Sequence, residues 1–555
     1  MTRIRTTRMH KGLACLLMLL SIVYVSVQGA EQSPIAAAAK ANNLTTVRAL
    51  IAKGTDVNAP QADGSTALLW AAYNGNAEMT KALLASRAKV DVTNKYGVTP
   101  LLQAARMGES AVMELLLNAG AKPTQLAADG TTPLMAAARA GSVEGARMLV
   151  ARGADVNAAD AFQEETALMW AAREGHLAVV KTLLEVGGNP NLKSHVTTLT
   201  ERRAADHPTG GMTALMFAVR DGHGDVAEAL IKGGADLKAT NGDANGGLMA
   251  GTAMHIAIVN DRFDLAARLL ELGADANDGS LFLAVDAHDG TTDARARDGS
   301  KLRPDHANKL TSMDLIRLLL DKGADPNKMF LGQFHNTSLG AGDFYAGSPF
   351  YKAAAQADVE VLKLLIARGA NVEWVPPQVT LPAAGRGGNA NWGRPALFAA
   401  MNGGRGAAFG AGPGFSRQGP PPFREPGTRS PAEAAKALIA AGADPNVWSW
   451  PDNSPPIHRA AALGNIDLIK TLVSAGAKLD SWDNDGNTPL QIAERTNTPE
   501  AIKRAEDAVI AAVANGTPVP ARGAPPQEVV NLIRDLMGLP PEAPKAVAAA
   551  EGGAK

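Results

Sequence analysis

A phrase of about 33 residues recurs along this chain and constrains its fold more than any other feature. The clearest copies begin at Thr66, Thr99, Thr132 and Thr166, which lie 33, 33 and 34 residues apart. Self-similarity at this period is typical of solenoid proteins, in which each repeat is one supersecondary unit. Related phrases begin at Thr213, Thr252, Ser348, Pro455 and Thr488, and weaker ones at Pro34, Leu281 and Pro395. The sequence therefore predicts about twelve units.

The copy that begins at Thr132 shows what each repeat is expected to form. Thr132 can cap a helix, and Pro133 suits the first helical position because a missing N–H costs nothing there. Gly141 ends this short Ala-rich helix, and a second helix with an apolar side is expected from Val143 until Gly153. The residues that follow lead into an Asp-Gly turn, which is typical of an extended finger loop.

Neither helix of such a pair can bury its apolar side alone, so neighbouring pairs must stack. We therefore predict an all-α solenoid of helix-turn-helix units with finger loops. Residues 31–278 are expected to form regular repeats, 279–517 repeats with long insertions, and 518–555 a Pro- and Ala-rich tail with one short helix. Either the insertions are tolerated drift or they shape a recognition surface. They fall at about 192–211, 238–250, 287–310, 328–347, 375–394 and 402–430.

Several motifs recur in one order and carry a family resemblance. They include the TPL-type openings, the Gly-His pair at Gly175-His176, the run Val179–Leu184 and the GADVN segment Gly153–Asn157. With these motifs, residues 34–517 resemble the ankyrin repeat. The resemblance implies a curved α-solenoid whose fingers and short inner helices line a concave face, and it implies protein binding without catalysis.

The chain departs from the family pattern at one position of the opening phrase. The histidine of that phrase is present only at His255 and His458. Its hydrogen bonds to the neighbouring loop are therefore expected to be lost in most units, with apolar packing in their place. The residues found there instead are Leu69, Leu102, Met135, Met169, Met216, Tyr351 and Gln491.

The N-terminus has the order of a secretory signal peptide over residues 1–30. Four cations precede a short apolar run, and cleavage after Gly29 fits the small-residue rule best. An uncleaved membrane anchor is the alternative. Cleavage removes Cys15, the single cysteine, and changes the formal charge from −1 to −1 − 4 = −5. The mature chain is thus expected in the periplasm or outside the cell, with no disulfide and no general attraction for nucleic acid.

No catalytic, cofactor or metal motif stands out, so neither an enzymatic activity nor a cofactor is expected. Asp483–Asn487 imitates the start of a calcium loop but lacks the distal Glu and matches a finger turn instead. Two groups of polar residues lack zinc spacing and are interpreted as surface side chains. The groups are His195 with Asp206 and His207, and Asp286 with His288 and Asp289.

Two sets of residues are candidates for partner binding. Arg106, Arg139, Arg173 and Arg220 occupy the same place in consecutive units, just before the central glycine, and Tyr73 precedes them in that place. This position ends the inner helix. Either the row is a solvated face partly neutralised by Glu174 and Asp221, or it binds acidic groups of a partner.

Tryptophans form the second candidate set. Trp374, Trp448 and Trp482 each follow a Gly-Ala helix end by a few residues and are expected on successive exposed fingers, where they would act as interface anchors. Packing of these rings against an adjacent insertion is the alternative. Trp392 and Trp450 lie in the same part of the chain. Trp70 and Trp170 lie inside the opening phrase and are predicted to belong to the core.

We expect an exported, non-catalytic scaffold that binds another protein on the concave face and fingers. Three alternatives stay open. They are a glycan or small-ligand binder that uses the tryptophan fingers, an enzyme with its site in residues 280–430, and a secreted host-directed effector. The partner's identity and the oligomeric state are not apparent from the sequence. The tail helix near Glu528 to Met537 either caps the last unit or docks a partner.

Overall fold

The computed structural model describes residues 33–197, 209–241, 251–288, 308–332, 345–377, 393–401, 430–450, 452–514 and 525–541. These residues form two compact units, of which unit 1 ends at Asn241 and unit 2 begins after it. Some predictions lie outside the described residues. They are the signal peptide at 1–30 with Cys15, residues 402–429 and 542–555, and the side chains of Asp206, His207, Asp289 and Trp392.

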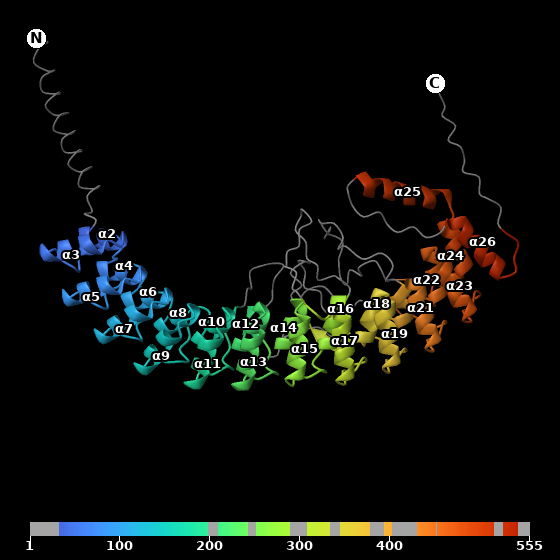
Figure 1. Ribbon diagram of the computed structural model, residues 1–555. Helices are drawn as coiled ribbons and strands as arrows, with labels where there is room; N and C mark the ends of the chain where they lie inside the picture. Colours follow the sequence, from blue (N-terminus) through green and yellow to red (C-terminus); the bar gives the residue numbers. More distant parts are fainter. Residues whose placement is uncertain are drawn as a thin grey trace, which may run out of the picture. The chain divides into compact units, whose positions relative to one another are not determined.

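Unit 1 is a stack of helical pairs in two rows (Figure 1). The short inner helices pack side by side in one row, and the outer helices pack side by side in the other. The inner row is α2 (Pro34–Lys40), α4 (Ala67–Tyr73), α6 (Pro100–Arg106), α8 (Pro133–Arg139), α10 (Ala167–Arg173) and α12 (Ala214–Asp221). The outer row is α3 (Leu44–Ala52), α5 (Ala77–Ala85), α7 (Ser110–Asn118), α9 (Val143–Ala151), α11 (Leu177–Glu185) and α13 (Gly224–Lys232).

Unit 2 repeats the pairing, with longer connections between some of its helices. Its pairs are α14 (Ala253–Val259) with α15 (Phe263–Glu271), α16 (Ser280–His288) with α17 (Ser312–Asp321), α18 (Pro349–Gln356) with α19 (Val359–Ala367), α20 (Ala396–Met401) with α21 (Pro431–Ala440), and α22 (Pro456–Leu463) with α23 (Ile466–Ser474). The last helices are α24 (Pro489–Thr496), α25 (Pro499–Ala514) and α26 (Pro526–Leu536).

Among the described residues, two short antiparallel hairpins accompany the helices, so the predicted helical solenoid is correct apart from these elements. In unit 1, β1 (Val196–Thr197) pairs with β2 (Thr209–Gly210). In unit 2, β3 (Phe330–Gly332) pairs with β4 (Tyr345–Gly347), with Phe330 opposite Gly347. Both hairpins lie within segments that interrupt the repeat pattern.

Local sequence sets where the helices begin and end, as predicted. The Thr132 side chain accepts a hydrogen bond from the Met135 N–H, and equivalent threonines cap the other inner helices of unit 1 from α4 onward. Such a cap contributes about 1 kcal/mol. Gly141 and Gly153 follow the two helices of this repeat with φ of +75° and +89°, in the left-handed region that glycine tolerates.

The core lies between the helices of each unit and is built mainly from Ala, Leu, Met and Val. Most of the residues that replace the histidine of the opening phrase are buried there, so apolar packing does substitute for its hydrogen bonds. The buried replacements are Leu69, Leu102, Met135, Met169, Met216 and Tyr351. Of the two histidines, His458 donates through Nε2 to the Asn487 carbonyl 2.9 Å away, and burial lowers its pKa.

An asparagine that follows several of the outer helices links successive repeats. The Asn157 side chain donates to the Gly187 carbonyl at 3.2 Å and accepts from the Asn189 N–H at 2.8 Å, so one amide satisfies two backbone groups of the next repeat. Each such bond contributes about 1 kcal/mol. The same double contact occurs at Asn58, Asn191, Asn277, Asn327 and Asn446.

The C-terminal end of unit 2 is capped by α26, which is the first of the two alternatives for the tail helix. Val529, Val530 and Ile533 are buried, and α26 packs against α24. Asn497 donates to Gln527 at 2.9 Å across this contact. None of the helices in the described ranges combines the length and the apolar character that crossing a membrane requires.

Candidate functional site

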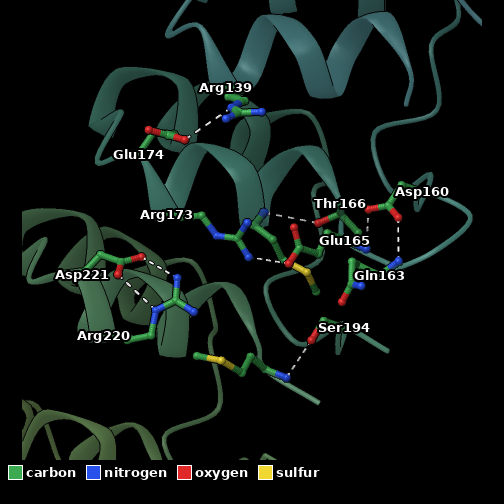
Figure 2. A network of polar contacts seen from close by, with 12 residues as sticks. Arg139, Asp160, Gln163, Glu165, Thr166, Arg173, Glu174, Ser194, Arg220 and Asp221 are labelled. Carbon is green, nitrogen blue, oxygen red and sulfur yellow. Dashed lines mark hydrogen bonds and ion pairs between the residues drawn. The ribbon is translucent and has the colours of Figure 1, made fainter. Parts of the chain in front are cut away.

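The arginine row of the sequence lies along the C-terminal ends of the inner helices of unit 1. Arg106, Arg139 and Arg173 are the last residues of α6, α8 and α10, and Arg220 is the penultimate residue of α12. These helices start from equivalent threonine caps and have nearly equal lengths, so stacking brings their last residues to the same edge. Figure 2 shows three of these arginines on successive helices.

Each arginine of the row has a carboxylate partner within unit 1. Arg220 binds both oxygens of Asp221, through Nε at 3.0 Å and Nη2 at 2.9 Å (Figure 2). Arg173 pairs through Nη2 with the buried Glu165. Arg139 lies 3.5 Å from Glu174, and Arg106 lies 3.8 Å from Asp129. The charges of the row are therefore balanced by the chain itself, and Glu165 and Asp129 join the two carboxylates expected from the sequence.

Aromatic rings alternate with the last three arginines. The Arg139 and Arg173 guanidinium carbons lie 4.7 and 5.6 Å from the centre of the Trp170 ring. The Phe217 ring lies between the next two arginines: the guanidinium carbons of Arg173 and Arg220 are 4.4 and 5.0 Å from its centre. Each stacked pair contributes roughly 0.5–1 kcal/mol at an exposed site. We call this series of five side chains the arginine column.

The positions of Trp70 and Trp170 correct their predicted place in the core. Both rings are half-buried, because an inner helix has neighbours on its two flanks and an outer helix behind it while its fourth side is open. Trp70 lies edge-on to Tyr73 at 5.6 Å, and the Lys40 ammonium lies 4.8 Å from the Trp70 ring centre. Tyr73 is exposed at the helix end, as the repeat alignment predicts.

Histidines of the following repeats fix the ends of α8 and α10. His176 hydrogen-bonds through Nε2 to the Arg139 carbonyl at 2.9 Å, and His223 to the Arg173 carbonyl at 3.0 Å. The carbonyl accepts, so Nε2 carries the proton in both rings. A Cβ added at Gly175 would lie 2.6 Å from the His223 ring, so only glycine leaves room for this contact. The backbone of the column is thereby held in place.

A row of exposed apolar side chains lies on the finger loops of the same unit. Tyr96, Leu126 and Phe162 are 68%, 54% and 65% exposed, and they belong to three successive fingers. Backbone hydrogen bonds join neighbouring fingers, such as the one from Ala128 N–H to the Tyr96 carbonyl at 3.2 Å. We call these three residues the finger row. The sequence patterns did not predict the finger row. The available signal was that the repeat needs no apolar residue at a finger turn, so large apolar residues there indicate another role.

The tryptophan fingers of unit 2 match their predicted exposure only in part. Trp482 is 67% exposed, whereas Trp374 and Trp448 are half-buried. Trp374 lies 5.5 Å from the buried Tyr351 ring, so it packs against its own repeat. Trp450, which was not among the predicted contact residues, is 68% exposed.

Asp286 and His288 differ from their interpretation as surface residues. Asp286 is buried and forms an ion pair with the buried Lys352 at 2.6 Å. His288 is half-buried and contacts Asp358 at 2.5 Å through Nδ1. His195 lies near the surface, 3.4 Å from Glu164. Where the structure is described, no three His, Cys, Asp or Glu side chains gather so that they could hold a metal ion.

The Asp483–Asn487 segment forms the finger turn that its sequence predicts. Asp483 Oδ1 accepts hydrogen bonds from the backbone N–H groups of Asp485 and Asn487, at 3.0 and 2.7 Å. Partial burial acts to raise the Asp483 pKa, but these backbone bonds and a bond from the Asn487 side-chain amide at 3.0 Å outweigh it and lower the pKa. The carboxylate therefore serves the turn.

Comparisons with known proteins agree with this architecture. Models of ankyrin repeats match residues 35–127, 122–194 and 194–280, and a further ankyrin model matches 457–505. Among matching solved structures is the ankyrin repeat domain of human ASB11, at 27% sequence identity and a TM-score of 0.36, over 43% of this chain and 98% of that one. The comparison with curated proteins finds no match. The repeat models, together with the stacked helical pairs, show that the chain belongs to the ankyrin repeat family.

Proposed function

We propose that unit 1 binds a partner protein non-covalently through the finger row and the arginine column. Ankyrin repeats generally mediate protein–protein interactions, and this family context supports binding over catalysis. The partner surface on this chain is proposed to include the predicted residues Tyr73, Arg106, Arg139, Arg173 and Arg220.

The observation that carries the proposal is the finger row. Tyr96, Leu126 and Phe162 keep more than half of their surface exposed although each is large and apolar. Exposed apolar side chains that gather on neighbouring elements are typical of contact sites, and aromatic residues are enriched among the residues that dominate binding energy. The backbone bond from Ala128 N–H to the Tyr96 carbonyl joins the fingers that carry Tyr96 and Leu126 before any partner arrives.

The arginine column supports the same function in a different way. The guanidinium groups of Arg173 and Arg220 are held by stacked rings and close carboxylates, so these two side chains lose little entropy when a partner binds. Since the charges are already paired, long-range attraction of an acidic partner is weak. Binding is therefore expected to depend on shape and on apolar contact more than on ionic strength.

A capture experiment with the full chain tests this proposal. Tyr96 and Phe162 are replaced together by Ser, and Val186→Ser serves as the matched control because Val186 is an exposed apolar residue at the end of an outer helix. The double variant is expected to lose most of the captured partner, while the control retains it. Equal capture by both variants would refute the proposal, provided that circular dichroism shows unchanged helix content.

A second candidate function, carbohydrate binding, rests on unit 2. Trp450 and Trp482 are both about two-thirds exposed, and their fingers are joined by the hydrogen bond from Asn484 N–H to the Asn453 carbonyl at 2.9 Å. Exposed indole rings on adjacent loops suit stacking against flat apolar faces. Quenching or a blue shift of tryptophan fluorescence by oligosaccharides, lost in Trp450→Ala and Trp482→Ala, would support this candidate. An unchanged spectrum would remove it.

A further inference from the structure

Two buried N–H groups of the arginine column have no acceptor among the described residues. Trp170 Nε1 is buried and unpaired, whereas its counterpart Trp70 Nε1 donates to Gln61 Oε1 at 2.9 Å. The equivalent residue in the longer finger before Trp170 is Asp160, because its N–H bonds the Glu165 carbonyl as the Gln61 N–H bonds the Ser65 carbonyl. The Asp160 carboxylate accepts from backbone N–H groups of its own turn, so this finger supplies no acceptor to Trp170.

Arg173 has the second unpaired donor, at Nε. Its guanidinium pairs with Glu165 through Nη2, but Nε is buried without an acceptor. Trp170 and Arg173 lie three residues apart on α10, which places them side by side on one face of the helix. Buried donors are nearly always paired in folded proteins, so two unpaired ones on the same face call for an explanation.

The charge balance of the column indicates which acceptor would fit. Arg139, Arg173 and Arg220 each already have a carboxylate from this chain. A further carboxylate would be placed near those of Glu165 and Glu174 and would be repelled. A neutral carbonyl oxygen, which has two lone pairs, can accept from both donors without adding charge.

We propose that Trp170 Nε1–H and Arg173 Nε–H bind a main-chain carbonyl oxygen of an extended, uncharged segment of the partner protein. This inference rests on the proposed function and names the chemistry of its central contact. The exposed Phe162 ring, on the finger that leads into α10, offers an apolar contact for the side chains of the same segment.

The two nitrogens are inaccessible to solvent in this structure, so a neighbouring side chain moves when the carbonyl binds. Arg139 is the neighbour held least firmly. Its guanidinium stacks on Trp170 at 4.7 Å, but its side chain is 61% exposed and its contact with Glu174 is 3.5 Å long. Exposed ion pairs of this kind are weak, so Arg139 can leave the ring at little cost.

Peptide binding to the full chain tests the inference. The probes are a capped, dye-labelled Gln-Leu-Gln-Leu-Gln peptide and its Glu-Leu-Glu-Leu-Glu counterpart, followed by fluorescence anisotropy. The indole resonances of ¹⁵N-tryptophan protein are recorded in parallel. The uncharged peptide is expected to bind more tightly than the acidic one, to shift the Trp170 indole resonance, and to retain its affinity as salt is raised.

Variants that each remove one of the two proposed N–H contacts sharpen the test. Trp170→Phe keeps a ring for Arg139 and Arg173 to stack on, and Arg173→Lys keeps the charge beside Glu165. Each is expected to weaken binding of the uncharged peptide about fivefold, the effect of one hydrogen bond of about 1 kcal/mol. Trp70→Phe is the matched control and is expected to bind normally, because the Trp70 N–H is already paired within the chain.

Three results would overturn the inference: no binding of either peptide, tighter and salt-sensitive binding of the acidic peptide, or unchanged affinity in Trp170→Phe. Capture of the native partner by the variants shows whether the inference alone fails or the proposed function fails with it. If Trp170→Phe captures the partner normally while the Tyr96 and Phe162 double variant does not, the inference falls and the proposed function stands. If both variants capture it normally, the proposed function falls as well.

Discussion

Replacing Gly175 by Ala is expected to loosen the junction between α10 and α13. Gly175 has a φ of +77°, and an added Cβ would lie 2.6 Å from the His223 ring. The left-handed backbone alone costs an alanine roughly 1–2 kcal/mol. The His223 ring must also turn away and lose its bond to the Arg173 carbonyl, which adds about 1 kcal/mol. The expected total is about 2–3 kcal/mol.

Two further variants separate these contributions. Gly187→Ala imposes the same backbone conformation, with a φ of +94°, but its Cβ would meet nothing within 4 Å. It is expected to show the backbone cost alone. In a His223→Ala background, Gly175→Ala is likewise expected to cost only about 1–2 kcal/mol, because the ring is gone.

Hydrogen exchange of the full chain, read in peptides that cover α10 to α13, measures these effects locally. Local measurement is needed because repeat proteins often do not unfold in two states. Equal losses in Gly175→Ala and Gly187→Ala, or no relief from His223→Ala, would refute the reasoning that the His223 ring fills the space above Gly175.

Three further predictions concern other parts of the chain. Asn157→Ala removes two hydrogen bonds to the next repeat and is expected to destabilise that junction by about 1–2 kcal/mol. Asn157→Asp keeps the acceptor, so its loss of stability is expected to be about half as large. Hydrogen-exchange rates of the 187–189 amides check both expectations. Burial lowers the pKa of His458 in the folded chain below its value of 6.5 in the unfolded chain. The unfolded state therefore binds the proton first as the pH falls. The free energy of unfolding of α22 to α24 is expected to be greatest above pH 6.5 and to decrease as the pH drops toward the folded pKa. Stability at pH 7.5 and 5.5, compared with His458→Gln, measures this, and an identical pH dependence in the variant would contradict it. Export with cleavage after Gly29 predicts a mature chain that begins at Ala30, which mass spectrometry of the intact protein from its native source checks.

The fold could be predicted from the sequence because its signals are local. A threonine cap, a proline at the first helical position and a glycine at the helix end act within one repeat, and their spacing then fixes the stack. Thr132 and Gly141 do what their residue types predict. The positions of the arginines at one edge follow from the same spacing.

The surroundings of the arginines could not be predicted in the same way. Trp170 lies within an apolar phrase, and only the stack shows that this side of α10 is open. The pairing of Arg173 with Glu165 joins residues eight positions apart across a helix start, so no helical spacing indicates it. Trp374 is half-buried because the Tyr351 ring lies beside it. The expectation that finger residues are exposed takes no account of such a neighbouring ring.

Site-specific photo-crosslinking tests the central claim most directly. A photoreactive phenylalanine analogue is placed singly at positions 96, 126 and 162 of the finger row and at position 186 on the outer side, and the full chain is irradiated in its native setting. The account predicts that the three finger positions crosslink to the same partner protein and that position 186 does not. Crosslinks that form equally from position 186, or no adduct from any finger position, would contradict it.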